Sequence, residues 1–291
     1  MSEEEVKNDE TCIQRDREKI FSHRFDHGAN FWSTVDNRLI KGAPFSTLES
    51  VSYLYELGEL EDSEVTQEIA PFIWQSWHND GRFQVAPHAT IYPCQTAAVA
   101  LALLQLGCSS DERLKVTYRH FLQIQETDGG WRCRKFSFGH GPETLASNSH
   151  PTLNILNFFR YFPDYQQQTT LNRAVEFLLS HWETRLPLGP CHYGMGKRFM
   201  QIEYPFRHYN IFYYVYVLSF YQYAHQDKRF LAALAVLETK CENGMIVVER
   251  VVPELAELSF CQKNHPSFLA TKRYQEIIRN VAQSQIHLPK G

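Results

Sequence analysis

A short turn recurs along the chain at a nearly constant interval, and this repetition constrains the fold more than any other feature. Residues 121–131, FLQIQETDGGW, end an amphipathic segment with Asp-Gly-Gly and a tryptophan, and residues 72–83, FIWQSWHNDGRF, share this layout. Gly81 and Gly129 are 48 residues apart. Less regular copies of the turn occupy residues 26–32, 174–194 and 234–246. A period of this length predicts a series of repeated helical units.

A second apolar segment follows each turn. These segments are residues 46–58, 95–107, 151–162, 209–224 and 266–282. Gly58 and Gly107, which end the first two segments, are 49 residues apart, so a second measure gives nearly the same period. The segments are apolar on nearly all sides, whereas those before the turns keep a polar stripe. We therefore predict five helical hairpins with buried inner helices, at approximately residues 16–58, 64–108, 111–163, 169–225 and 228–285.

Five consecutive hairpins with buried second helices predict an all-α fold, an α/α toroid in which outer helices surround a ring of inner helices. In the turns, glycine accepts backbone angles that other residues resist, and the aromatic residue packs beneath the turn. We accordingly interpret Asp128 as a structural residue of its turn and not as a catalytic acid. Residues 1–15 are acidic and predict a mobile tail, and residues 16–291 are expected to form a single domain.

Composition excludes several classes of function. A 291-residue chain that is 43% hydrophobic can bury a sizeable core. The net charge of −4 does not indicate a nucleic-acid-binding protein, which would carry an excess of basic residues. The apolar runs at residues 97–104 and 211–218 are too short to span a bilayer, and the charged start does not read as a signal peptide. Seven scattered cysteines indicate reduced thiols, so we expect a cytoplasmic protein without a transmembrane segment; the oligomeric state stays open.

The turn and its surroundings resemble a known repeat. Gln125 with DGGW at residues 128–131, together with QTAAVALALLQLG at residues 95–107, is similar to the repeat of squalene–hopene cyclases and protein prenyltransferase β-subunits. As a pattern, the resemblance covers most of residues 16–285 and is specific in the second and third units. It implies an α/α toroid whose central cavity holds an isoprenoid chain, with a prenyl diphosphate as the substrate class.

Two acidic motifs of these enzymes are absent from the sequence. Class II terpenoid cyclases protonate an alkene with an Asp-x-Asp-Asp box, and class I cyclases hold magnesium with an Asp-Asp-x-x-Asp box; neither occurs here. Protein prenyltransferases instead use zinc held by Asp, Cys and His near the starts of inner helices. The resemblance therefore directs attention to the same positions of this chain.

The starts of the inner segments carry Cys or His at one equivalent position. This position is occupied by Phe45, Cys94, His150, His208 and His265. In a toroid, equivalent positions point toward the same end of the axis, so one sulfur and three imidazoles would meet there. Because zinc prefers Cys and His, we predict a zinc site formed by Cys94, His150, His208 and His265. The alternative is a structural loop–helix junction with Cys94 as a small buried residue, and the family's Asp ligand is missing here.

Helix-capping residues occur two positions further along each inner segment. They are Thr47, Thr96, Thr152, Asn210 and Ser267. Short polar side chains of this kind accept hydrogen bonds from the free N–H groups of a first helical turn, so we predict that all five are N-terminal caps.

Basic residues gather at turns that lead into the inner segments. The candidates for binding a diphosphate are Arg134, Lys197, Arg198 and Arg207. The alternative is a solvated basic rim. Lys197 and Arg198 belong to a long loop, residues 189–199, whose Cys191-His192 pair resembles the Cys-His-Gly of zinc-dependent lanthionine cyclases; an incidental surface loop is the alternative.

The fourth inner segment is unusually aromatic. Tyr209, Phe212, Tyr213, Tyr216 and Phe220 recur at spacings of three and four, which places them on one helical face. Such a wall suits an isoprenoid chain and stabilises carbocations through the ring quadrupole. Ordinary core packing is the alternative interpretation.

The sequence favours an isoprenoid-handling enzyme, a prenyltransferase or a terpene cyclase-like protein, that binds a hydrophobic substrate in an axial cavity. Two other classes stay open. One is a glycan-active toroid that uses carboxylates among Glu49, Glu143, Glu203 and Glu249; the other is a non-catalytic binding protein. No phosphate-binding Gly-rich loop occurs, so no nucleotide cofactor is expected.

Overall fold

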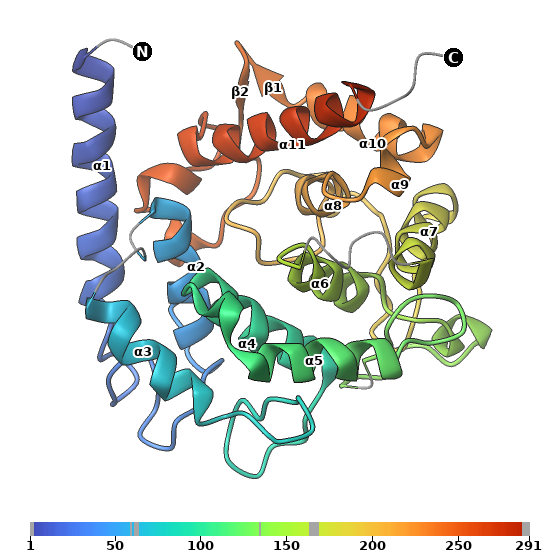
Figure 1. The fold of residues 1–291 in the computed structure, drawn as a ribbon. Helices are drawn as coiled ribbons and strands as arrows, with labels where there is room; N and C mark the ends of the chain where they lie inside the picture. The colour runs from blue at the N-terminus through green and yellow to red at the C-terminus, as the bar shows by residue number, and fades with distance from the viewer. Residues whose placement is uncertain (1–2, 59, 61–63, 134, 163–168, 287–291) are drawn as a thin grey trace.

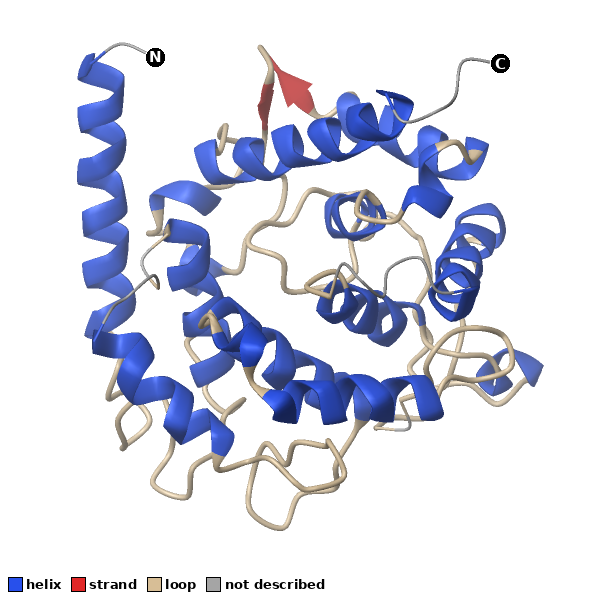
Figure 2. Ribbon diagram, viewed as in Figure 1, coloured by secondary structure: helices blue, strands red, loops and turns tan. Residues whose placement is uncertain are grey.

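The computed structural model describes residues 3–58, 60, 64–133, 135–162 and 169–286. These residues are rich in helix and contain little sheet (Figure 2), which confirms the all-α class. The α-helices are α1 (Glu3–Ser22), α2 (Thr47–Leu57), α3 (Glu64–Trp74), α4 (Pro93–Gln105), α5 (Glu112–Gln123), α6 (Ser149–Phe159), α7 (Thr169–Thr184), α8 (Ile211–Leu218), α9 (Gln222–His225), α10 (Lys228–Glu238) and α11 (Phe268–Ile286).

The remaining regular structure is short. Strands β1 (Cys241–Glu242) and β2 (Met245–Ile246) form an antiparallel pair in which Cys241 lies opposite Ile246. The 3-10 helices are η1 (Cys108–Ser110), η2 (Pro142–Leu145), η4 (Pro253–Leu255) and η5 (Ser259–Cys261). Among the described helices, none combines the length and the apolarity needed to cross a membrane.

Each predicted inner segment contains a helix: α2, α4, α6, α8 and α11. Helices α8 and α5 show the burial expected of an inner and an outer helix, whereas α11, predicted as an inner helix, keeps Phe268, Lys272 and Ile278 exposed. All eight residues of α8 are buried, whereas α5, before the turn at residues 128–131, buries only one face. The first residues, 1–15, which we expected to form a mobile tail, overlap α1 from Glu3 onward.

The inner helices pack against one another in chain order. Helix α2 contacts α4, α4 contacts α6, α6 contacts α8, and α8 contacts α11. A second set of helices packs on these: α1 on α2, α3 on α4, α7 on α6 and α10 on α8 (Figure 1). Helix α5 also packs on α4. The last inner helix also reaches the first, because Arg273 Nε of α11 donates to Glu56 Oε2 of α2 at 2.8 Å.

The recurring turn has the same local role in the second and third units. Gly129 has φ +92°, and a Cβ added there would lie 2.4 Å from the backbone oxygen of Arg173 in α7. Gly81 has φ +87°, and its Cβ would lie 2.8 Å from the backbone oxygen of Val116 in α5. Each glycine therefore allows its turn to approach the next outer helix closely. Asp128 accepts hydrogen bonds from Gly130 N and, at 2.7 Å, from the Ser147 hydroxyl, which agrees with a structural role.

The aromatic residues after the turns are fixed by backbone and hydroxyl partners. Trp131 is fully buried, its Nε1 donates to Phe121 O at 2.8 Å, and Trp32 donates in the same way to Ile20 O. The N–H of Trp131 donates to Thr152 Oγ1 at 3.0 Å. In the preceding unit, Phe83 N donates to Thr96 Oγ1, which is the equivalent bond.

The prediction that all five polar residues cap their helices is therefore only partly correct. Asn210 accepts from Tyr213 N at 3.0 Å, and Ser267 accepts from Ala270 N, as caps do. Thr96 and Thr152 instead lie inside their helices and bind the preceding turn. Thr47 donates to Phe31 O. In the first three units the hydroxyls of Thr47, Thr96 and Thr152 therefore connect the preceding turn to the inner helix. The capping pattern in the sequence does not predict this tertiary contact.

Candidate functional site

A cavity of about 160 Å³ lies among α2, α4, α6 and the segment that leads into α8. Its lining residues are Leu48, Glu49, Ser52, Tyr53, Ala97, Ala98, Leu101, Gln105, His150, Asn154, Phe206, Arg207 and Tyr213. The volume is below the roughly 300–1,000 Å³ of typical small-molecule sites. Helices α2, α4 and α6 are the helices of the first three predicted inner segments.

Polar groups of this cavity gather around one ion pair. Arg207 donates to Glu49 Oε1 from Nε at 3.0 Å and from a terminal nitrogen at 2.5 Å. Tyr53 is almost fully buried, and its hydroxyl has no hydrogen-bond partner within the described part of the chain. Burial, together with the nearby Glu49 carboxylate, raises the pKa of Tyr53 well above its ordinary value. A neutral, unpaired phenol beside a buried ion pair is a position at which a polar ligand atom gains a hydrogen bond.

Three of the five predicted wall residues, Phe212, Tyr213 and Tyr216, belong to α8 and contact the ring of Phe206. Tyr213 lines the cavity, and Phe206, which the sequence did not single out, stacks on it at 5.1 Å between ring centroids. Phe212 and Tyr216 also contact the Phe206 ring, each at 5.0 Å. The Phe206 ring therefore occupies part of the space beside α8 in which the sequence predicted a bound ligand. The segment that leads into α8 runs between the inner helices in Figure 1.

The other two predicted aromatic residues lie away from the cavity lining. Tyr209 stacks on His181 at 5.8 Å and contacts Phe199 at 4.8 Å. Phe220 lies beneath the Arg160 guanidinium, with 4.5 Å from Cζ to the ring centroid. These contacts are those of packed core and of a cation–π pair.

The four predicted zinc ligands do not meet at one centre. Cys94 Sγ lies 2.9 Å from Cys133 Sγ, His208 is hydrogen-bonded to Glu203, and His265 is exposed. Across the described residues, no group of three or more His, Cys, Asp or Glu side chains is arranged to hold a metal ion. Two thiolates on a tetrahedral zinc are about 3.8 Å apart, since each Zn–S bond is about 2.3 Å. The described positions of these residues show no shared metal centre. Zinc stays a prediction, and metal analysis of protein purified without chelator tests it.

His150 lies in the cavity wall beside three tyrosines. Its ring centroid is 5.3 Å from that of Tyr193, and Tyr209 and Tyr213 are also in ring contact. Burial, with a smaller contribution from His208, lowers the pKa of His150 to about 3. The imidazole is therefore neutral at pH 7 and offers the cavity one donor and one acceptor.

His208 is oriented by a buried carboxylate. Its Nδ1 lies 2.5 Å from Glu203 Oε1, and Arg250 forms an ion pair with the other oxygen of Glu203. Burial, assisted by the cations Arg207 and Arg198, lowers the pKa of His208 to about 4. In the neutral ring, the tautomer with the proton on Nδ1 donates a hydrogen bond to Glu203. A histidine held in this way presents Nε2 as a proton acceptor.

Three cysteines converge beside this wall. Cys94 follows the first residue of α4, and its thiol contacts the sulfur of Cys133. The Cys191 sulfur lies 3.5 Å from the carbonyl oxygen of Cys133. A hydrogen bond between the Cys94 and Cys133 sulfurs is the main cause that lowers the pKa of Cys133. Cys133 was not among the candidate residues, although it lies two positions after the turn tryptophan.

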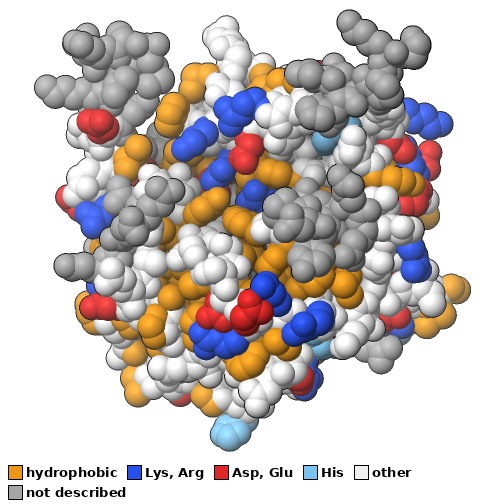
Figure 3. Space-filling model, viewed as in Figure 1, with side chains coloured by type: hydrophobic (Ala, Val, Ile, Leu, Met, Phe, Trp, Pro, Cys, Tyr) orange, Lys and Arg blue, Asp and Glu red, His pale blue; other side chains and the backbone are white. Residues whose placement is uncertain are grey.

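The described residues predicted to bind a diphosphate do not all line the cavity. Arg207 lines the cavity, whereas Lys197 and Arg198 are exposed in the long loop. Arg134 lies outside the described residues. On the face drawn in Figure 3, basic side chains are interspersed with acidic ones. Of the described candidates, Arg207 is therefore the cation that contributes to the cavity.

The four candidate carboxylates of the glycan-active alternative have separate partners. Glu49 binds Arg207, and Glu203 binds His208 and Arg250. Glu249 accepts from Lys240 at 2.7 Å, and Glu143 lies 3.3 Å from His192. Each carboxylate is paired with a basic side chain, and within the described part of the chain no hydrogen bond joins two of the four.

Most of the lining residues that the sequence did not single out lie four positions from another lining residue. Tyr53 and Asn154 come four residues after Glu49 and His150, so each lies one helical turn along the same face. Ala97, Leu101 and Gln105 follow the same spacing on α4. Phe206, which precedes α8, carries no such spacing signal.

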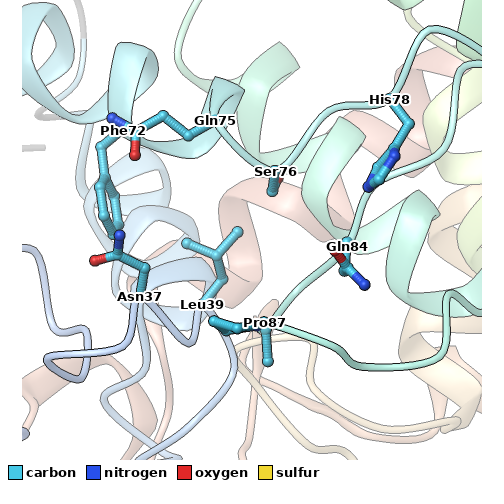
Figure 4. A pocket seen from close by; sticks show the side chains of 9 residues that line it. Asn37, Leu39, Phe72, Gln75, Ser76, His78, Gln84 and Pro87 are labelled. Atoms are coloured by element: carbon cyan, nitrogen blue, oxygen red, sulfur yellow. The ribbon is translucent and has the colours of Figure 1, made fainter.

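A second pocket of about 220 Å³ lies at α3 and its flanking loops (Figure 4). It is lined by Asn37, Leu39, Phe72, Gln75, Ser76, His78, Gln84, Ala86 and Pro87. Ser76 and Gln84 use their side chains to bind the backbone oxygens of Ile73 and Ala89. None of the candidate residues predicted from the sequence lines this pocket, and its polar side chains support the local loops.

Buried His181 gives the protein a predictable response to acid. The ring is fully buried in α7, contacts Leu186 O and the Tyr209 hydroxyl, and burial lowers its pKa to about 4. Above pH 6.5 the ring is neutral in both folded and unfolded chains. Between pH 6.5 and about 4 only the unfolded chain takes up the proton, so stability should fall with pH by up to ~1.4 kcal/mol per unit.

This response can be measured by urea unfolding at pH 4.5 to 7.5. We expect His181→Gln to be less stable than the parent at pH 7.5 but to lose less stability as the pH falls. Parallel profiles for the two proteins would show that His181 does not cause the dependence.

No family model matches the chain, and the search of curated proteins found no similar sequence.

Proposed function

We propose that this protein is an isoprenoid-handling enzyme, of the prenyltransferase or terpene cyclase-like type, whose five hairpins close into an α/α toroid. The packing of α2, α4, α6, α8 and α11 in chain order supports the closed arrangement, as does the ion pair from Arg273 to Glu56. The turn at residues 128–131 and its resemblance to the cyclase and prenyltransferase repeat support the substrate class.

One observation carries this proposal: the cavity between inner helices has an apolar wall and a polar group of residues on one side. Ala97, Ala98 and Leu101 supply apolar surface from α4, and Phe206 and Tyr213 supply aromatic faces. A prenyl chain would lie against these residues. The small volume favours a short chain, such as dimethylallyl or geranyl, over longer ones.

Arg207 is the proposed binding residue for the diphosphate. Its guanidinium is paired with Glu49. A diphosphate carries more negative charge than the Glu49 carboxylate, so the guanidinium would donate its hydrogen bonds to the diphosphate instead. The Tyr53 hydroxyl and the neutral His150 ring would add hydrogen bonds. When the diphosphate leaves, the faces of Tyr213 and Phe206 would stabilise the allylic cation.

Thermal unfolding with geranyl diphosphate, dimethylallyl diphosphate and inorganic diphosphate tests the proposal. A ligand present at a hundred times its Kd adds about 2.7 kcal/mol, which should raise the Tm by roughly 5 °C or more. We expect Leu101→Trp, which fills the cavity, to abolish the shift. Leu231→Trp at an exposed site of α10 is the matched control and should keep it.

Arg207→Met should weaken prenyl diphosphate binding by at least ~10-fold, the loss expected for a charge-assisted hydrogen bond. An equal shift with inorganic diphosphate, or a shift that survives Leu101→Trp, would contradict binding of the prenyl chain in this cavity. Binding without release of diphosphate on incubation with an acceptor alcohol would favour the non-catalytic alternative.

A further inference from the structure

Cys94 and Cys133 form a close thiol pair outside the proposed ligand cavity lining. Their sulfurs are 2.9 Å apart, although the residues are 39 positions apart in the sequence. This separation is less than 1 Å longer than a disulfide bond of about 2.05 Å. It is also shorter than the spacing of two thiolates on one zinc ion, about 3.8 Å. The distance therefore suits covalent joining of the sulfurs better than shared metal binding.

The start of α4 supports thiolate chemistry at this pair. Cys94 follows Pro93, the first residue of a 13-residue helix, so its backbone N–H is one of the free donors of the first turn. Free donors and the positive end of the helix favour negative charge on sulfur. Cys133 is almost fully buried, whereas Cys94 and Cys191 are partly exposed, which leaves a route for a small oxidant.

From this geometry we propose that Cys94 and Cys133 are a redox-active dithiol, a covalent modification site that hydrogen peroxide converts reversibly to a disulfide. In the first step a thiolate of the pair attacks one peroxide oxygen, the O–O bond breaks, and a sulfenic acid and hydroxide form. In the second step the partner thiol attacks the sulfenic sulfur, the S–S bond forms, and the sulfenic oxygen leaves as water. Two thiols and one peroxide thus give one disulfide and two waters. A thiol reductant reverses the change.

The disulfide would join the start of α4 to the segment directly after Trp131. Tyr193 lies near this pair and is in ring contact with His150; burial raises its pKa, and the sulfurs of Cys191, Cys94 and Cys133 add to the rise. Oxidation would therefore fix the turn of the third unit to the inner helix of the second. The inference does not depend on the proposed isoprenoid function, because it concerns only the sulfurs and their surroundings.

The test uses the full chain, reduced, freed of reductant and treated with EDTA. After titration with hydrogen peroxide and catalase quench, the unfolded protein is alkylated and its intact mass is measured. We expect the chain to lose two of its seven thiols and to recover both with dithiothreitol. Tryptic peptides should identify a Cys94–Cys133 link. The pair should react at least ~10-fold faster than Cys108, which has no neighbouring sulfur of this kind among the described residues.

Matched serine variants locate the reaction. Cys191→Ser should still form the Cys94–Cys133 link, whereas Cys94→Ser should accumulate a sulfenic acid that reacts with dimedone. Circular dichroism checks that each variant is folded, and the peptide link in the unaltered protein needs no variant at all. Retention of all seven thiols, or a link from Cys133 to Cys191 instead, would overturn the proposal. Stoichiometric zinc that is lost in Cys94→Ser would overturn it as well, because the sulfurs would then be metal ligands.

Discussion

Arg273→Ala is expected to lower the free energy of unfolding by about 3–5 kcal/mol, the loss typical when one partner of a buried ion pair is removed. The side chains of Arg273 and Glu56 are 12% and 8% exposed, so the charge left on Glu56 would be poorly hydrated. Glu56 also accepts the Tyr204 hydroxyl, and Arg273 also binds Glu276 at 3.0 Å. Removal of the guanidinium therefore leaves two carboxylates close together without their shared cation.

Urea unfolding followed by circular dichroism measures this loss. Lys115→Ala is the control, because its ion pair with Glu112 lies on the surface of α5 and should contribute less than ~1 kcal/mol. The double variant Glu56→Leu/Arg273→Met should recover much of the stability, since no charge stays buried. A loss below 1 kcal/mol in Arg273→Ala would mean that the pair does not hold α11 against α2.

Gly129→Ala is expected to cost about 2–4 kcal/mol, from a strained backbone and from overpacking against α7. The residue has φ +92°, and the new Cβ would lie 2.4 Å from Arg173 O and 2.7 Å from its carbonyl carbon. Neither is the flexible end of a side chain, so α7 or the turn must move. Gly81→Ala should behave similarly, because its Cβ would meet the backbone of α5.

Gly58→Ala separates the cost of backbone strain from the cost of overpacking. Gly58 has φ +81°, but within the described part of the chain an added Cβ meets no heavy atom within 4 Å. It should therefore cost only about 1 kcal/mol, the conformational part alone. Thermal or urea unfolding of the three variants gives the comparison. Equal losses at Gly58 and Gly129 would mean that the turn does not press against the next outer helix.

The helices were predictable because their signals are local. Burial periodicity and the glycines that end or turn a helix lie within a few residues of the structure they specify, as at Gly58 and residues 128–131. The use of Thr152 was not predictable in this way. Its hydroxyl binds Trp131 N, 21 residues earlier, and a local rule reads the same threonine as a cap.

The candidate site depended on contacts between distant segments. Arg207 meets Glu49 across 158 residues, and Cys94 meets Cys133 across 39, because irregular loops bring them together. Equivalent helix positions alone predicted that His150 would face the cavity, and it does. They did not predict that Glu203 would hold His208 or that the loop before His265 would leave that ring exposed.

The contact between the two ends of the chain has a consequence for how the protein unfolds. Asp16 of α1 is buried and accepts from Ser259 N of η5 at 2.9 Å, so the first and last helical pairs are neighbours. An open solenoid can lose a terminal repeat while the remainder stays intact. Here a frayed end would expose both terminal units at once, which should make melting a single cooperative event and give amide protons of α2 and α11 similar exchange protection.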